Sequence, residues 1–407
     1  MLAFLRLLGA HPRLLGFGFL LPFVSAYGQT FFLGVFGAEW RRAFDLSNGA
    51  FGLVYSLATL ASAALLLWLG RLIDRVDLRA YTAATLGACA GSCAFVALMP
   101  THHAGFLLLA FVLLRMLGQG LMSHIGVTTM GRYFEQARGT AVSIASLGFP
   151  VAEGVFPPLG VALLATVGWR GTWGLLGAVL LIGVLPLALW LLRGHSAQEQ
   201  ARAGRQRARA AEGSGAGDWR LGQALHDPRF YLMLPGVLVT PFTVTGLFFH
   251  QTVLVAQKGW TLAGFAGAFV VFAAVSMVAT LLAGRTIDRG GARRLLPVFL
   301  LPLAAGLGLL TLGDGAWIAP AFMAGTGITA GVGLTLMGAI WAEVYGPTHL
   351  GAIRSFVWSL VLGSTALAPV LFGTLLDDGV SMAALAGACL VLALAAALLA
   401  VPVARRA

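Results

Sequence analysis

The sequence predicts an all-α membrane protein whose twelve transmembrane helices form two pseudo-symmetric six-helix bundles. Hydrophobic residues make up 59% of the 407 residues and charged residues only 10%, a composition that cannot cover a water-soluble surface. The segment Gly70–Arg75 (GRLIDR) returns as Gly284–Arg289 (GRTIDR), 214 residues later and again directly after a long apolar run. A repeat at about half the chain length indicates two copies of one membrane-embedded unit.

Each copy contains six apolar runs that are long enough to cross a hydrocarbon core, which takes about 20 helical residues. In the first copy these runs cover 14–38, 47–69, 80–99, 105–130, 140–166 and 172–192, and in the second 229–253, 262–283, 295–312, 317–342, 355–375 and 382–402. They are expected to be helices, because an open strand edge in lipid leaves backbone groups unpaired. The predicted domains are therefore bundles at 1–193 and 229–407, joined by a linker at 194–228.

The linker is polar and basic, with Arg202, Arg205, Arg207 and Arg209 interleaved with alanine. A solvated tether between the bundles explains it. The alternative is an amphipathic helix on anionic lipid, which attracts such segments by about 1 kcal/mol per basic residue.

Basic residues decide the expected orientation, because they are retained on the cytoplasmic side of a membrane. Arginines fill the termini, the linker and every second loop, whereas the opposite loops contain only Arg41, Arg42, Arg170 and Lys258. We therefore expect a multi-pass protein of the inner (plasma) membrane with both termini in the cytoplasm. The net charge of +11 is spread over separate segments, which argues against nucleic-acid binding.

Two fully charged residues fall deep within the predicted spans, where charge is costly and usually functional. Arg115 lies about ten residues into the fourth span, roughly 15 Å deep, and Glu153 lies at similar depth in the fifth. Antiparallel neighbouring helices could bring them within reach. Glu153 could then exchange a proton as Arg115 or an anionic solute moves. The alternative is a permanent structural ion pair.

Uncharged polar residues complete the candidate site. Tyr27, Gln29 and Thr30 are expected to interrupt helix 1, and Thr240–Gly246, which includes Thr243 and Thr245, to interrupt and bend helix 7. His250, near the end of helix 7, is a candidate titratable group at an outer gate. A plain interfacial histidine is equally consistent with the sequence.

Four short motifs lie at corresponding places of the predicted spans. Gly70, Asp74, Arg75 and Arg79 follow the second span, and the second copy has Gly291 where the first has Asp77. Arg115-Met-Leu-Gly-Gln-Gly120 lies in the fourth span, Arg138-Gly139 precedes the fifth, and Gly168-Trp-Arg170 precedes the sixth. In this order they resemble the loop signature after helix 2, the helix 4 signature, the entry to helix 5 and the turn before helix 6 of the major facilitator superfamily, over essentially the whole chain. The first loop departs from that signature at Asp77, where a second glycine is usual. The resemblance implies a secondary transporter working by alternating access.

The duplicated loop has a physical interpretation of its own. Asp74 and Asp288 lie at helix ends, where a carboxylate can pair with arginine or face the positive end of a helix. We predict a pair of conformational latches formed by Gly70, Asp74, Arg75, Gly284, Asp288 and Arg289. Charges that merely anchor the topology are the alternative.

A weaker resemblance to bacterial carriers of the monocarboxylate and oxalate type rests on Gly28-Gln-Thr-Phe-Phe32, Glu39-Trp40 and Glu343-Val-Tyr-Gly346. Those carriers place an arginine in helix 8, whereas 262–283 contains no charge, so Arg115 would have to bind the carboxylate. A proton-driven exporter of hydrophobic or cationic compounds is the alternative.

No nucleophile triad, metal cluster or phosphate loop is apparent, so we expect no enzyme activity, cofactor or metal site. The expected partners are a small-molecule solute, protons and the lipid bilayer, with the protein acting as a monomer.

Overall fold

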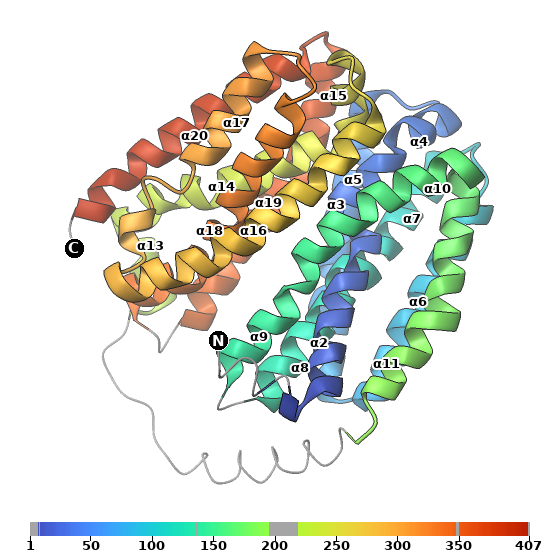
Figure 1. The fold of residues 1–407 in the computed structure, drawn as a ribbon, viewed down its shortest axis with the longest axis horizontal. Coiled ribbons are helices and arrows are strands. Elements are labelled where there is room, and N and C mark those ends of the chain that lie inside the picture. The colour runs from blue at the N-terminus through green and yellow to red at the C-terminus, as the bar shows by residue number, and fades with distance from the viewer. Residues whose placement is uncertain (1–6, 8, 135–136, 195–218, 347–349, 406–407) are drawn as a thin grey trace. The chain divides into compact units, whose positions relative to one another are not determined.

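The computed structural model describes residues 7, 9–134, 137–194, 219–346 and 350–405, and all of its regular structure is helical (Figure 1). Within this described part, nine helices are long and apolar enough to cross a membrane, and ten if the bent pair Pro12–Gly28 and Thr30–Phe44 is one span. The prediction of an all-α membrane fold is therefore confirmed. The count of twelve remains a prediction: 139–191 forms one run with a non-helical backbone only at Gly168, and Leu301–Leu312 is short.

The chain divides into two compact units, one of residues 1–39 and 57–213 and the other of residues 40–56 and 214–407. The part of the second span up to residue 56 thus groups with the second unit. The predicted linker at 194–228 falls largely outside the described residues. Its last part is structured, and the backbone N–H of Trp219 donates to the carbonyl of Tyr345.

The first predicted span (14–38) of the first unit, called helix 1, is broken into short pieces. Gln29 adopts an extended backbone with ψ of 145°, and the preceding Ser25–Gly28 is a tight 3₁₀ turn. The elements of this unit are α2 (Pro12–Val24), η1 (Ser25–Gly28), α3 (Thr30–Leu33), η2 (Gly34–Phe36), α4 (Gly37–Phe44), α5 (Asn48–Leu69), η3 (Gly70–Asp74), α6 (Leu78–Leu98), α7 (Ala104–Leu114), η4 (Arg115–Met122), α8 (Ser123–Tyr133), α9 (Arg138–Ser146), α10 (Gly148–Ala178), η5 (Val179–Val184) and α11 (Leu185–Leu191), with α4 and α5 continuing across the unit boundary. Packing of α2 against α8, α9 and α10, and of α6 against α10, builds the core.

Several long helices, joined by short ones, form the second unit. Its elements are α13 (Leu221–Leu225), α14 (Pro228–Phe249), α15 (Gln251–Gln257), α16 (Leu262–Gly290), η6 (Arg293–Leu295), α17 (Leu301–Leu312), α18 (Ile318–Tyr345), α19 (Leu350–Asp377) and α20 (Met382–Arg405). Extensive contacts join α16 to α18, and glycine makes them possible: a Cβ on Gly327 or Gly331 would collide with the backbone of α16. Figure 1 shows these two helices side by side.

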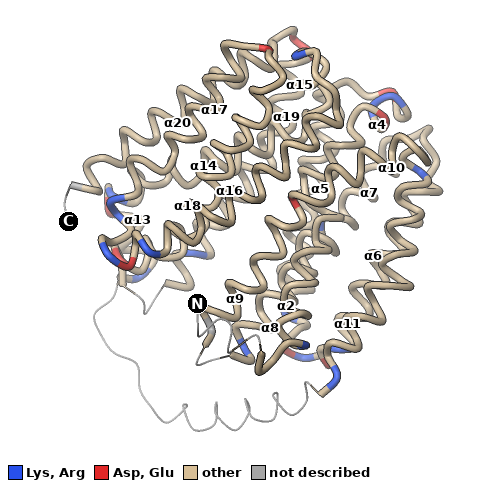
Figure 2. The backbone as a smooth tube through the Cα atoms, in the orientation of Figure 1, with Lys and Arg blue, Asp and Glu red and all other residues tan. Residues whose placement is uncertain are grey.

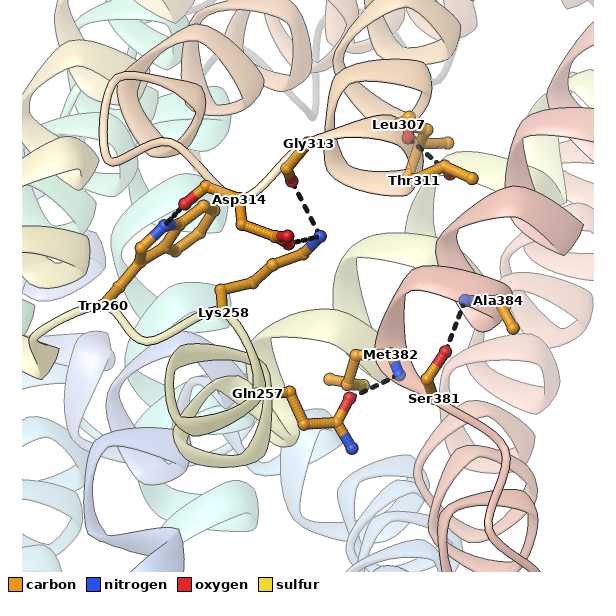
Figure 3. A network of polar contacts seen from close by, with 10 residues as sticks. All are labelled: Gln257, Lys258, Trp260, Leu307, Thr311, Gly313, Asp314, Ser381, Met382 and Ala384. Carbon is orange, nitrogen blue, oxygen red and sulfur yellow. Dashed lines mark hydrogen bonds and ion pairs between the residues drawn. The ribbon is translucent and has the colours of Figure 1, made fainter.

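A polar network ties together the loops at one end of the second unit (Figure 3). The buried Lys258 ammonium donates to the Gly313 carbonyl at 2.8 Å and pairs with Asp314 at 2.7 Å, while the indole of Trp260 donates to the Asp314 carbonyl. Gln257 accepts the first amide of α20 at Met382. A lysine buried this deeply needs such partners, and they fix the turns after α15 and α17.

The beginning of α5 packs against α19 within the second unit. The Asp377 carboxylate accepts the backbone N–H groups of Asn48 and Gly49 at 3.0 and 2.7 Å, where the positive end of the α5 dipole favours a negative charge. Gly52 and Gly373 allow this approach, because a Cβ on either would overlap the backbone of the facing helix. Asp377 therefore caps a helix more than 300 residues away in sequence.

Candidate functional site

The break in helix 1 lies against a distorted segment of the fourth span. The segment η4, which begins at Arg115, is a π-helix, a form that is rare and frequent at functional sites. Gly28 and Gly118 meet here so closely that a Cβ on Gly28 would collide with the Leu114 carbonyl, and one on Gly118 with the Gly28 amide. The crossing of the two distorted segments therefore depends on glycine at both positions.

Arg115 is positioned by this crossing. It is 3% exposed, and its Nη1 lies 3.4 Å from the carbonyl oxygen of Gly28, at the last residue before the break in helix 1. A break in a helix frees backbone carbonyls that a guanidinium can bind. An arginine guanidinium has five N–H donors, and the Gly28 carbonyl is one of its partners.

Glu153 lies on α10, well inside a membrane-spanning run, and is partly exposed. Among the described residues none forms an ion pair or hydrogen bond with its carboxylate, Arg115 included. Arg115 and Glu153, which were predicted to lie within reach of each other, therefore do not form an ion pair in the structure. The two helices are neighbours in sequence, but Arg115 is held instead by helix 1.

Aromatic rings connect helix 1 to the Glu153 segment. Phe156, one turn after Glu153, contacts the rings of Phe23, Tyr27 and Phe32 at centroid distances of 5.2, 5.5 and 5.4 Å. Such edge-on and tilted pairs each contribute about 0.5–1.5 kcal/mol beyond their buried area. They form an aromatic cluster that begins one helical turn from Glu153.

The three polar residues predicted at the break divide into two kinds. Tyr27 is 2% exposed and its hydroxyl donates to the Leu176 carbonyl at 3.3 Å, so its phenol is fixed within the unit. Gln29 forms the break and Thr30 follows it, and both side chains are partly exposed. These two remain candidates for contact with a solute, whereas the phenol of Tyr27 is buried.

Helix 7 differs from the prediction. The helix α14 continues without interruption from Pro228 to Phe249, so the expected break at Thr240–Gly246 is wrong. Pro241 lacks an N–H donor, but membrane helices tolerate proline because neighbouring groups and local adjustments satisfy the freed backbone. Thr243 is fully buried and Thr245 is 7% exposed, as expected for packing positions.

His250 ends α14 and is 1% exposed. Its Nε2 lies 2.9 Å from the carbonyl oxygen of Pro369 in α19, and Gly52 of α5 approaches the same carbonyl. Its ring also packs edge-on against Phe249. His250 therefore belongs to the contact region of α5 and α19 within the second unit, beside the helix cap formed by Asp377.

The first copy of the duplicated loop contains an ion pair. Asp74 binds the guanidinium of Arg132, at the end of α8, at 2.5 Å, and Arg132 also donates to the Ile73 carbonyl. The Gly70 carbonyl lies 3.2 Å from Nε2 of His124. Arg75 is exposed and forms no ion pair with any described residue.

The second copy is built differently. Gly284 lies inside α16 with open space beside it, and Asp288 and Arg289 are exposed and unpaired within the described part of the chain. The charge pair joins Arg293 to Glu343 of α18 at 3.4 Å, and Glu343 also accepts the backbone N–H of Ala292 at 2.6 Å. Asp288 therefore does not form the arginine pair expected of it.

Sequence reasoning missed the partners that come from distant segments. Arg132 and Glu343 complete the two charge pairs, Gly118 permits the crossing at Gly28, and Phe156 packs against the aromatic rings of helix 1. The internal repeat holds one usable signal: Glu343 lies 211 residues after Arg132, close to the repeat offset. Because Arg132 and Glu343 have opposite charges at related positions, the repeat could have suggested that the acid and the base of the ion pair exchange places between the two halves.

The sequence was compared with family models and with characterised proteins. The family model for the Major Facilitator Superfamily matches residues 18–326. Human monocarboxylate transporter 14 is 27% identical over 152 residues, and human monocarboxylate transporter 6 is 28% identical over 153; each match covers 37% of this chain and 29% of the relative. The chain thus matches less than a third of the length of these curated relatives.

A solved structure has the same fold across nearly its whole length. The inward-facing, unoccupied bacterial homologue of the human lysosomal transporter Spinster matches with a TM-score of 0.66, covering 97% of this chain and 95% of that one. The sequence identity is 16%, so this likeness establishes the fold alone.

Proposed function

Since this chain belongs to the major facilitator superfamily, and is therefore a membrane transporter rather than an enzyme, we propose that it carries a small organic anion coupled to protons. Carboxylates are the favoured substrate class. The observation that supports the proposal most directly is the buried Arg115 guanidinium at the broken part of helix 1.

Arg115 has the chemistry of a carboxylate-binding group. A guanidinium can hold a carboxylate through two parallel hydrogen bonds, and in a site from which water is largely excluded the attraction is strong. The Gly28 contact is long, at 3.4 Å, so an entering anion could replace it. The partial matches to two human monocarboxylate transporters favour the same substrate class.

Glu153 is the proposed proton carrier. An intramembrane carboxylate without a cationic partner is costly, so a change in its protonation can accompany movement of the solute. Proton exchange requires a carboxylate that is not fully enclosed, and Glu153 is partly exposed. The proposed cycle alternates between states in which Glu153 takes up and releases one proton.

The decisive experiment compares Arg115→Lys with Glu153→Gln in proteoliposomes. Arg115→Lys keeps the charge but loses the planar fork, so a carrier of organic anions should bind its substrate at least tenfold more weakly. Glu153→Gln should abolish proton-driven accumulation while leaving exchange of preloaded substrate largely intact. Full uphill transport by Glu153→Gln with an unchanged pH profile would contradict the proposal.

A proton-driven exporter of hydrophobic or cationic compounds is the second candidate, favoured by the aromatic cluster of Phe23, Tyr27, Phe32 and Phe156 that begins one helical turn from Glu153. In that case Glu153 would bind the cation. Little change in affinity for Arg115→Lys and loss of binding for Glu153→Gln would select this function.

We also propose that the charge pairs of the two loops act as latches. Replacing Asp74 by Asn should increase the accessibility of cysteines introduced at predicted cytoplasmic positions, because the Arg132 pair can no longer form. Unchanged accessibility together with unchanged transport would leave the pairs as topological anchors. The proposed inner-membrane location with cytoplasmic termini can be checked by labelling a cysteine at Asp378 from the outside.

A further inference from the structure

The end of α16 carries a hollow that lies outside the proposed solute and proton sites at Arg115 and Glu153. Its volume is about 690 Å³, and it is lined by Leu282, Arg285, Thr286, Arg289, Gly290 and Arg294, a set called the arginine hollow below. Three of these six residues are arginines and none is acidic.

Local backbone geometry brings the three guanidinium groups together. Arg285 and Arg289 are four residues apart on α16 and therefore share one face of the helix. Gly291 then adopts φ of +79°, which reverses the chain and returns Arg294 to the same end. As a result Nη1 of Arg294 lies about 3.3 Å from the place where a side chain on Gly290 would begin.

The nearby carboxylates do not neutralise this cluster. Glu343 is engaged by the Ala292 N–H and by Arg293, and Asp288 does not line the hollow. Arg285, Arg289 and Arg294 form no ion pair with any residue that the structure describes. Gathered like charges repel one another, so an anion among them would be stabilised by several charge-assisted hydrogen bonds.

An apolar stripe leads along α16 to the arginine hollow. Val278, Leu281 and Leu282 are 56, 67 and 54% exposed, on a helix that spans the membrane. Exposed aliphatic side chains on such a helix face lipid acyl chains. One ligand can match both parts: acyl chains against the stripe and a phosphate among the arginines.

We propose that the arginine hollow binds the headgroup of an anionic glycerophospholipid. Arginine forks match phosphate oxygens geometrically, and basic pockets at the predicted cytoplasmic end of spans suit such headgroups. The apolar stripe favours a lipid over a soluble phosphate, which would gain nothing from it.

The test measures the melting temperature of the whole protein, purified in uncharged detergent, with added phosphatidylglycerol or phosphatidylcholine. The test variant is R285Q/R289Q/R294Q. The matched control is R71Q/R75Q/R79Q in the first copy of the loop, where Asp74 and Asp77 lie among the arginines. Inorganic phosphate and glycerol 3-phosphate serve as soluble probes.

Phosphatidylglycerol should raise the melting temperature of the parent and of the control variant more than phosphatidylcholine does, and this difference should disappear in the test variant. Native mass spectrometry should show fewer retained phosphatidylglycerol molecules on the test variant alone. If the triple variant does not fold, R285Q/R294Q takes its place.

Three results would overturn the proposal. Retention of the full lipid effect in the test variant would exclude the arginine hollow. An equal loss in the control variant would indicate general surface charge. The same stabilisation by inorganic phosphate would identify a soluble anion as the ligand.

Discussion

The two copies of the duplicated loop have nearly the same sequence but opposite charge pairs. In the first, the acid is on the loop and the base is on a packed helix (Asp74 with Arg132); in the second, the base is on the loop and the acid is on the helix (Arg293 with Glu343). Figure 2 shows charged segments at the helix ends of both units. Both halves therefore have an ion pair between the loop and a packed helix. The loop supplies the acid in the first half and the base in the second.

Burial also distinguishes the pairs. The Asp74 side chain is 58% exposed, whereas those of Arg293 and Glu343 are 19 and 32% exposed. Glu343 additionally accepts a hydrogen bond from the buried Ala292 N–H, whereas Asp74 makes no such backbone contact in the described structure. The second pair is expected to stabilise the fold and the first to be easily broken.

The largest difference is expected on exchanging the charges within each pair. Arg293→Glu with Glu343→Arg should destabilise the protein by about 1–3 kcal/mol, because an arginine cannot accept the Ala292 N–H. Asp74→Arg with Arg132→Asp can re-form its ion pair and loses only the long Arg132 contact with the Ile73 carbonyl, so it should cost about 1 kcal/mol or less. The melting temperatures of the two double variants, measured in the same detergent, compare the two losses of stability. Equal losses would show that the two pairs are equivalent.

The next largest loss of stability is expected for replacing Gly291. Its φ of +79° is disfavoured for other residues, so Gly291→Ala should cost about 1–3 kcal/mol, and its Cβ would approach Glu343 Oε1 at 3.1 Å. Gly284→Ala is the control: this residue is helical with open space around it and should be neutral or stabilising. A thermal shift assay on Gly291→Ala and Gly284→Ala would measure the two changes in melting temperature. A larger loss at Gly284 would show that the reversal at Gly291 is not required.

The first loop has Asp77 where the second has Gly291, and a different contact holds it. The Asp77 carboxylate accepts the Ala80 N–H at 2.9 Å and caps α6. Asp77→Ala should therefore cost about 0.5–2 kcal/mol, and Asp77→Asn much less, because asparagine is also a good cap. Chemical denaturation in mixed micelles can resolve this difference. Equal effects of the two variants would point to charge rather than capping.

The smallest effects concern Asp288. It is exposed and forms no ion pair with the described residues, so Asp288→Asn should change stability by less than about 0.5 kcal/mol. Glu343→Gln should exceed it clearly, because it removes the charge from a bonded carboxylate. If Asp288→Asn proved the more damaging in the same thermal assay, Asp288 would have a partner beyond those described.

The sequence by itself determined the class of fold, the repeat and the positions of charged residues within the apolar runs. Long apolar runs leave the backbone of a membrane protein little choice but helix, and an arginine or glutamate within such a run can be read directly from its position. Arg115, Glu153 and an interruption of helix 1 by Tyr27, Gln29 and Thr30 were predicted from sequence in this way. These signals are local, since they depend only on neighbours along the chain.

Only the tertiary structure decided which charges meet. Arg132 and Glu343 reach their loops across 58 and 50 residues from Asp74 and Arg293, and Arg115 is held by Gly28 of helix 1 rather than by Glu153. The continuity of α14 through Pro241 likewise depends on packing around the missing hydrogen bond. Helix rotation and glycine-mediated approach fix these contacts, and both arise from the summed packing of many helices, which no single segment encodes.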